Sequence, residues 1–91
     1  MQYVCCYDIR DDRRRNKVAR LLDDFGQRIQ YSVFCLTLDG DRKTPLTERL
    51  RSLIDADRDS ILLLPLCSRC AETIMTLGHE RMPRKASAWI V

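Results

Sequence analysis

Asp8 is the residue of this sequence whose position points most directly to chemistry. It follows an apolar, β-prone run at residues 3–7 and precedes an arginine-rich segment. A carboxylate at a strand end can hold Mg²⁺, which takes oxygen ligands, and a bound metal can activate water to hydrolyse a phosphodiester. A single carboxylate binds Mg²⁺ poorly, so a metal site here would need a two-fold dimer that brings two copies of Asp8 together. The alternative is that Asp8 caps a turn or pairs with a nearby arginine.

Six basic side chains lie within the eleven residues from 10 to 20, and three of them are the consecutive Arg13, Arg14 and Arg15. Consecutive residues sample different faces of a helix, so at least two of these arginines should reach solvent. A guanidinium can grip a phosphate through two hydrogen bonds. The alternative is a solvated face that forms ion pairs with the acidic neighbours Asp11, Asp12, Asp23 and Asp24.

Arg28, Gln30, Ser32 and Phe34 alternate along an extended segment, so we expect them to share one face. Polar and aromatic groups together can contact a nucleic-acid backbone and stack on bases. The alternative is a polar outer face beside one core phenylalanine.

Cys67 and Cys70 have CxxC spacing, which is found in metal and redox sites. A structural zinc site needs four ligands, and only Cys35 and the lone His79 are available to complete it. We therefore expect two ordinary, partly buried thiols and a surface position for His79. The cysteine total of five is odd, which argues against a secreted disulfide framework and for reduced thiols.

The 91 residues suffice for one domain, and 32% of them are charged, with a net charge of +3. This mild positive charge is compatible with a polyanionic partner without proving one. The longest apolar run, residues 61–67, is far too short to cross a bilayer, and the chain starts without a basic leader. We therefore expect a soluble, cytoplasmic protein with no membrane partner.

The first predicted helix follows the arginine-rich segment. Asp11 or Asp12 is expected to cap it, and it should run to about Phe25, where Gly26 would end it in a left-handed conformation. Its apolar positions follow the spacing of one buried stripe: Val18, Leu21, Leu22 and Phe25.

The middle of the chain predicts an extended segment and a second helix. Residues 28–38 are long for one strand, so we expect a break, bulge or hairpin, placed between Ser32 and Cys35. Thr44 is expected to cap the second helix, with Pro45 at its first position. The apolar stripe of this helix is Leu46, Leu50, Leu53 and Ile54.

Residues 60–66 are nearly all apolar and predict a strand at the centre of a sheet. We expect a turn at 67–70, a short helix or strand at 71–77, a loop at 78–86 and an extended tail at 87–91. The resulting strand–helix–strand–strand–helix–strand order suits an α+β domain of ferredoxin-like arrangement, with an antiparallel sheet, both helices on one face and an extra C-terminal strand. The other face needs a cover, and a second copy of the chain would supply it.

Several segments together resemble one known family. They are Tyr7-Asp8-Ile9-Arg10, the run from Arg14-Arg15 to Leu22, the alternating segment from Gly26 to Phe34, and Asp59-Ser60-Ile61. Their order and spacing are similar to those of the CRISPR-associated Cas2 family, whose members are small adaptation proteins also described as endoribonucleases. The resemblance covers about residues 3–67. Cys35 and Leu36 depart from it, because an acidic residue and often a glycine are frequent there.

The resemblance implies a single ferredoxin-like domain over residues 1–91 and a homodimer joined through its sheets. The tail, about residues 79–91, would pair with the partner protomer. Asp8 would be the catalytic residue and the ligand for Mg²⁺, one from each chain near the two-fold axis. The positions matched for nucleic-acid binding are Arg14, Arg15 and Arg28, with Tyr7, Ser32 and Phe34 in support.

The resemblance also implies an activity and a partner. Members of the family are described as Mg²⁺-dependent nucleases that cut single-stranded RNA or duplex DNA. In spacer acquisition the dimer bridges two dimers of the spacer integrase, the CRISPR-associated Cas1 family, and holds the DNA fragment to be inserted.

Three alternatives stay open beside a metal-dependent nuclease in an adaptation complex. The first alternative is a scaffold only, in which Asp8 is structural. The second is a related toxin-type ribonuclease without an integrase partner. The third alternative is a small ligand-binding regulatory module, against which the arginine-rich helix start argues because that segment suits a phosphate backbone better.

Overall fold

The computed structural model describes residues 1–79. Its elements are β1 (Gln2–Asp8), α1 (Asp12–Asp23), β2 (Gly26–Gln30), β3 (Val33–Thr37), α2 (Gly40–Leu53), β4 (Ser60–Leu66) and the short α3 (Ser68–Glu72). Three predictions lie outside the described residues: the tail at residues 87–91, the pairing of about residues 79–91 with the partner protomer, and most of the loop at 78–86. Among residues 1–79, no helix is long and apolar enough to span a membrane.

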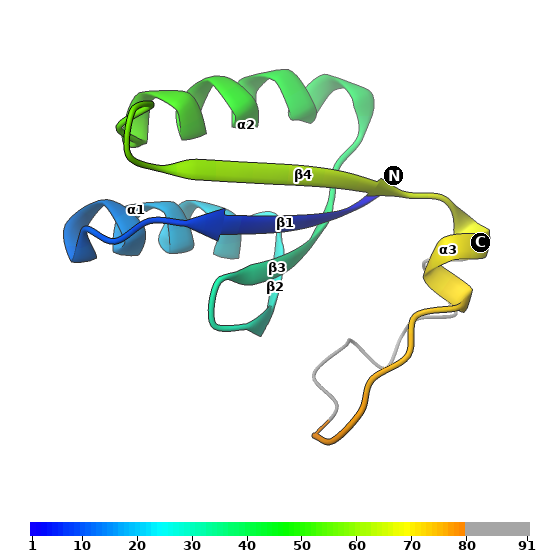
Figure 1. Cartoon of the computed structure of the whole chain (residues 1–91). Helices are drawn as coiled ribbons and strands as arrows, with labels where there is room; N and C mark the ends of the chain where they lie inside the picture. The colour runs from blue at the N-terminus through cyan, green and yellow to red at the C-terminus, as the bar shows by residue number, and fades with distance from the viewer. Residues whose placement is uncertain (80–91) are drawn as a thin grey trace.

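The four strands form one antiparallel sheet in the order β2-β3-β1-β4. α1 connects β1 to β2, and α2 connects β3 to β4 (Figure 1). Two interleaved strand–helix–strand units of this kind make a ferredoxin-like α+β fold, as the order of elements predicted. The two central strands are β1 and β3.

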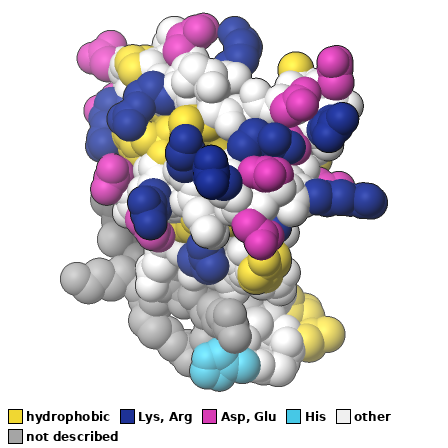
Figure 2. Space-filling view, turned by 90° about the vertical axis from the view of Figure 1, so that its left-hand side faces the viewer, with side chains coloured by type: hydrophobic (Ala, Val, Ile, Leu, Met, Phe, Trp, Pro, Cys, Tyr) yellow, Lys and Arg dark blue, Asp and Glu magenta, His cyan; other side chains and the backbone are white. Residues whose placement is uncertain are grey.

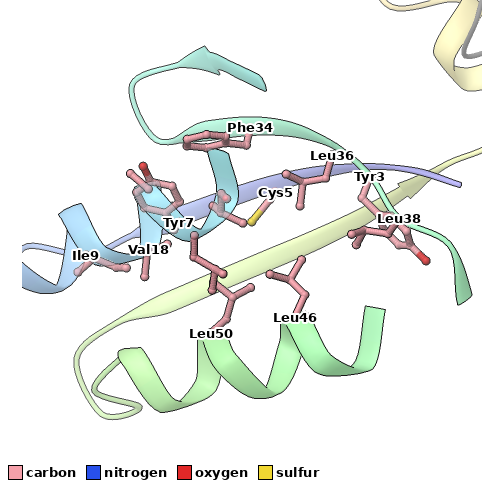
Figure 3. Close-up of a cluster of buried hydrophobic side chains, with 13 residues drawn as sticks. Tyr3, Cys5, Tyr7, Ile9, Val18, Phe34, Leu36, Leu38, Leu46 and Leu50 are labelled. Carbon is pink, nitrogen blue, oxygen red and sulfur yellow. The ribbon is translucent and has the colours of Figure 1, made fainter. Parts of the chain in front are cut away.

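The core lies between the sheet and the two long helices. Along β1 the side chains of Tyr3, Cys5 and Tyr7 are buried while their neighbours are not, because successive residues of a strand point to opposite faces. Figure 3 shows these three side chains in one cluster with Leu46 and Leu50 of α2. The other core members come from α1, β3 and the segments between elements: Ile9, Val18, Ala19, Leu21, Leu22, Phe34, Leu36 and Leu38.

α1 begins as predicted but ends differently. Asp11 is its N-cap, and the Asp11 side chain accepts a hydrogen bond from the backbone N–H of Arg14. The predicted left-handed stop at Gly26 is wrong, since the helix ends at Asp23 with Asp24 in a right-handed helical conformation. Gly26 is already the first residue of β2, and its φ is not positive.

The extended segment is a tight hairpin, with its turn at Tyr31 and Ser32, slightly before the predicted break between Ser32 and Cys35. A register irregularity between Arg28 and Gln30 adds a bulge in β2. Gly26 faces β3 so closely that a Cβ there would lie 1.9 Å from the backbone oxygen of Cys35. Glycine is therefore required at this position by space.

The predicted start of α2 is wrong. The helix begins four residues before Thr44, because Asp39 is the N-cap and its side chain accepts a hydrogen bond from the N–H of Arg42 at 2.9 Å. Pro45 consequently lies inside the helix, where it cannot donate a helical hydrogen bond. Leu46 and Leu50 are buried as predicted, while Leu53 and Ile54 pack against the core partly exposed; Ile54 lies just past the end of the helix.

β4 is an edge strand, so its predicted central position is wrong. It pairs with β1 and with no other strand in the described part of the chain. Its apolar run reflects two apolar faces: Ile61 and Leu63 pack against the core, whereas Leu62 and Leu64 point to the opposite side and are 58% and 47% exposed. The strand is apolar at nearly every position because its outer face, which the helices leave uncovered, is apolar as well.

Candidate metal and nucleic-acid site

Asp8 is the last residue of β1 and lies opposite Ser60, the first residue of β4. Because Tyr7 points into the core, Asp8 points to the face of the sheet that carries no helix. Its side chain is exposed, and within residues 1–79 its carboxylate forms no hydrogen bond or ion pair. The structure thus gives no support to the alternatives of a turn cap or an arginine pair, and leaves both oxygens free to bind a ligand.

Asp8 does not belong to a preformed cluster of metal ligands in the described part of the protomer. No group of three or more His, Cys, Asp or Glu side chains that could hold a metal occurs among residues 1–79. Within residues 1–79 Asp8 therefore supplies a free carboxylate outside any such cluster, and water, nucleic acid or a second protomer could supply further ligands.

The sheet face on which Asp8 lies is strongly apolar. Its members come from three neighbouring strands and lie side by side in register: Val4 and Cys6 of β1, Val33 and Cys35 of β3, and Leu62, Leu64 and Leu66 of β4. We call this set the open sheet face. Exposed leucines grouped in this way are typical of a surface that another molecule covers.

Arg14, predicted to contact phosphate, is engaged within the protomer. Its Nε donates to Oδ2 of Asp59 at 2.8 Å and its Nη2 donates to Oδ1 at 3.3 Å. The Asp59 side chain is only 1% exposed, and it also accepts a hydrogen bond from the N–H of Asp55 at 2.9 Å. Both bonds lower the pKa of Asp59, the one from Arg14 more strongly. Arg14 therefore holds α1 to the loop that precedes β4.

Arg15 holds the loop that follows Asp8. Its Nη1 donates to the backbone oxygens of Ile9 and Arg10 at 3.1 and 3.2 Å, and its Nη2 pairs with the Asp12 carboxylate. The guanidinium carbon also lies 5.7 Å from the ring centre of Tyr31, in the hairpin turn. Arg15 thus fixes the backbone on which Asp8 is carried.

Tyr7, Ser32 and Phe34 support the same end of the sheet. The Tyr7 backbone N–H donates to the backbone carbonyl oxygen of Ser32 at 3.0 Å. The Tyr7 hydroxyl donates to the backbone carbonyl oxygen of Tyr31 at 3.4 Å. The rings of Tyr7 and Phe34 lie 6.3 Å apart, in the core. These contacts join the hairpin turn to the end of β1.

Arg28 and Phe34 share a face, but across two strands rather than along one. The guanidinium of Arg28 covers the Phe34 ring at 5.2 Å, and Phe34 has no exposed surface. Phe34 is therefore unavailable for stacking on a base. The predicted common face of Arg28, Gln30, Ser32 and Phe34 is wrong, because the turn and the bulge interrupt the alternation.

Arg13, Lys17 and Arg20 are the basic residues of α1 that point outward. They lie at helical positions i, i+4 and i+7, are all exposed, and form no ion pair with any residue in the described part of the chain. We call them the α1 basic stripe. Their 3.6-residue spacing was visible in the sequence and distinguishes them from the inward Arg14. Figure 2 shows the end of the molecule near the Asp8 loop, where Lys and Arg side chains alternate with Asp and Glu rather than forming one continuous patch.

The cysteines and His79 complete the list of candidate groups. His79 is exposed, as predicted. Cys67 and Cys70 are exposed rather than partly buried, because they lie at the start of α3, beyond the end of the sheet. In the described residues they have no third ligand near enough to form a metal group.

Comparison with known proteins gives one consistent result. The family model described as CRISPR associated protein Cas2 matches residues 1–74. A protein of Synechocystis named CRISPR-associated endoribonuclease Cas2 3 is 39% identical over 89 residues, which is 98% of this chain and 97% of the relative.

Two solved structures are similar over most of their length. A hypothetical protein of Thermus thermophilus superposes with a TM-score of 0.82 at 36% identity, covering 91% of this chain and 96% of the other. The Cas2 of Streptococcus pyogenes, solved at pH 6.5, superposes with a TM-score of 0.79 at 31% identity, covering 86% and 100%.

Proposed function

The chain belongs to the CRISPR-associated protein Cas2 family, and from this membership we propose that it is a homodimeric CRISPR adaptation protein with a metal-dependent endonuclease site formed by the two copies of Asp8. The observation that carries the proposal is the position of Asp8: a free, exposed carboxylate at the end of β1, on the apolar open sheet face.

The open sheet face supports the homodimer. Leu62 and Leu64 expose about half of their surface in the single protomer, next to Val4 and Cys6 of the neighbouring strand. Burying such surface against an equivalent face is favourable by about 25 cal/mol per Å² of apolar area. A two-fold arrangement would use one patch on both subunits. Because Asp8 lies at one end of this face, a two-fold axis passing close to that end would bring the two carboxylates together.

Two carboxylates fit Mg²⁺ better than one. Magnesium prefers oxygen ligands and is usually held by one or two carboxylates, with water and substrate phosphate completing its shell. When bound, the ion would supply a polarised phosphate and an activated water. Asp8 would hold the ion, while Arg15 keeps the Ile9–Arg10 backbone, and with it the Asp8 carboxylate, in place.

The α1 basic stripe is the part of the surface that we propose contacts the nucleic-acid backbone. Arg13, Lys17 and Arg20 have no acidic partner among residues 1–79, so a phosphate would not have to displace one. Arg14 and Arg15 are engaged with Asp59 and with the Asp8 loop, and we assign them to positioning instead. Arg28 is exposed on the edge strand β2 and remains a candidate contact.

The substrate and the integrase partner follow from family membership. The relative in Synechocystis is named an endoribonuclease, which supports RNA cleavage by this chain as well. Bridging of two Cas1 integrase dimers is proposed on the same ground. The match to the Cas2 family model favours this role over that of a toxin-type ribonuclease.

The proposal is tested with labelled single-stranded RNA and duplex DNA, incubated with the purified chain in Mg²⁺ or in excess chelator. Cleavage of either substrate in Mg²⁺ alone supports the nuclease. Binding of the duplex without cleavage under both conditions contradicts it and indicates that the protein is a scaffold only.

A further inference from the structure

The sequence Cys67-Ser-Arg-Cys70 lies at the junction of β4 and α3, and its two thiols are both exposed. The buried Cys5 and Cys35 behave differently. Burial raises the pKa of Cys5 to about 12 and that of Cys35 to about 11, which keeps both as inert thiols. Cys67 and Cys70 are therefore the accessible pair, and none of the proposed nuclease chemistry uses them.

The backbone brings the two thiols to the same place. Cys67 is the N-cap of α3, with φ −76° and ψ 168°, and its Sγ accepts a hydrogen bond from the N–H of Cys70 at 3.5 Å. Residues three apart at a helix start lie on the same side of the first turn. The backbone N–H of Cys70 and the sulfur of Cys67 are accordingly in direct contact.

The two thiols are electronically unequal. Hydrogen bonds from the backbone N–H and then the thiol of Cys70 lower the pKa of Cys67, since they stabilise its thiolate. The side-chain hydrogen bond with Cys67 raises the pKa of Cys70, because Cys70 is the donor and its ionisation would lose that bond and bring two negative sulfurs together. A low-pKa attacking sulfur followed by a second thiol is the arrangement of CxxC redox pairs.

We propose that Cys67 and Cys70 are a redox-active dithiol that low-molecular-weight disulfides, such as oxidised glutathione, convert to an intramolecular disulfide. The Cys67 thiolate attacks one sulfur of the external disulfide, forming a mixed disulfide and releasing the first external thiolate. Cys70 then loses its proton and attacks the Cys67 sulfur, which releases the second external thiolate. The two protein thiols are oxidised by two electrons, and one external disulfide is reduced to two thiols.

The disulfide would fix the first turn of α3 directly beyond β4, the strand whose leucines form part of the open sheet face. A tetrahedral zinc site is a different use of the same spacing and needs two further ligands. Residues 1–79 supply no third ligand in one group with this pair. The observed geometry therefore favours the disulfide.

The test uses the full chain, reduced and freed of reductant, and incubated with oxidised glutathione. Unfolding in excess maleimide then counts the free thiols by intact mass. We expect three labelled cysteines in place of the five in the sequence, with peptide mapping placing the bridge between 67 and 70. Five labelled cysteines, or a bridge between other positions, would overturn the proposal.

Two variants separate the roles. Cys70→Ser should accumulate a stable mixed disulfide at Cys67, and Cys67→Ser should react more slowly at Cys70. Equal rates in the two variants would contradict an attacking role for Cys67. A parallel incubation in zinc chloride without oxidant should leave both thiols open to maleimide, and zinc protection of both would replace the disulfide with a metal site.

Discussion

The guanidinium of Arg14 and the carboxylate of Asp59 form a two-point ion pair between residues that lie 45 positions apart in the sequence. The contact joins the first turn of α1 to the residue before β4, and so flanks Asp8 and Ser60, which face each other across β1 and β4. The buried carboxylate of Asp59 thus holds α1 to the start of β4, close to the proposed metal ligand Asp8.

Asp59 is expected to make stability depend on acid pH. Its pKa in the folded protein lies below its ordinary value, because Arg14 and the N–H of Asp55 hold the ionised form. A group of this kind stabilises the fold above its unfolded pKa, about 3.9, and the stabilisation is lost as pH falls through the folded pKa. Asp59→Asn should therefore lower the free energy of unfolding at neutral pH and flatten its fall below about pH 4.

Denaturant unfolding across that pH range provides the measurement, with Asp57→Asn as control. Asp57 is exposed in the same loop and has no ion pair within residues 1–79. Its variant should follow the wild-type pH curve. A wild-type curve for Asp59→Asn would mean that the ion pair contributes nothing to folding.

Gly26→Ala should destabilise the β2–β3 hairpin. The added methyl would lie 1.9 Å from the backbone oxygen of Cys35, which cannot rotate away. Overpacking of this kind costs about 1–3 kcal/mol. Gly40→Ala is the matched control, since a Cβ at Gly40 meets nothing within 4 Å. Thermal or urea unfolding compares the two, and equal stability would show that the hairpin tolerates a wider spacing.

Leu64→Lys should convert the dimer to a monomer. The substitution places a charge at the middle of the open sheet face, opposite Val4 in the register, where burial without a partner is unfavourable. Light scattering at micromolar concentration should give a dimer mass for wild type and for Thr44→Lys, which adds the same charge on α2. A dimeric Leu64→Lys protein would place the interface elsewhere.

Neutralising the α1 basic stripe should weaken binding to duplex DNA in a salt-dependent way. Each lost phosphate contact lowers the slope of log affinity against log salt by about 0.9. The triple change of Arg13, Lys17 and Arg20 to Gln should reduce the slope, measured by fluorescence anisotropy. The same change at Arg49, Arg51 and Arg58 removes equal charge from another part of the surface. If the two triple variants gave equal slopes of log affinity against log salt, the α1 basic stripe would not be the DNA-contacting surface.

Local patterns in the sequence were sufficient to predict the fold. The β-prone run at residues 3–7 predicted the first strand, and the stripe through Val18 and Leu22 identified the helix face that meets the core. The order of elements then indicated the ferredoxin-like sheet. The start of α2 was missed because Asp39 competes with Thr44 as a cap, and capping preference alone does not rank them.

The misplacement of β4 has a different physical cause. A strand with two apolar faces has the same composition whether its second face meets helices or a second molecule. Leu62 and Leu64 therefore gave β4 the composition of a central strand, although both side chains are largely exposed in the protomer.

The place of Asp8 at the end of a strand was predictable from the sequence, whereas the contacts of the neighbouring arginines were not. Asp8 follows from its place at a strand end, whereas the division between Arg14 and Arg13 depends on which helix face meets Asp59. The helical spacing separates Arg13 from the inward Arg14, but the partner Asp59 lies 45 positions away, so no local pattern identifies it.

We propose that Asp8 is the metal ligand of a nuclease. The rate of RNA and duplex cleavage by wild type, Asp8→Asn and the control Asp23→Asn, purified in parallel, tests this role. Asp23 is an exposed aspartate at the end of α1. We expect Mg²⁺-dependent cleavage by wild type and Asp23→Asn, and only background cleavage by Asp8→Asn, with all three proteins dimeric. Equal cleavage by all three proteins would contradict the assignment of Asp8 as the metal ligand.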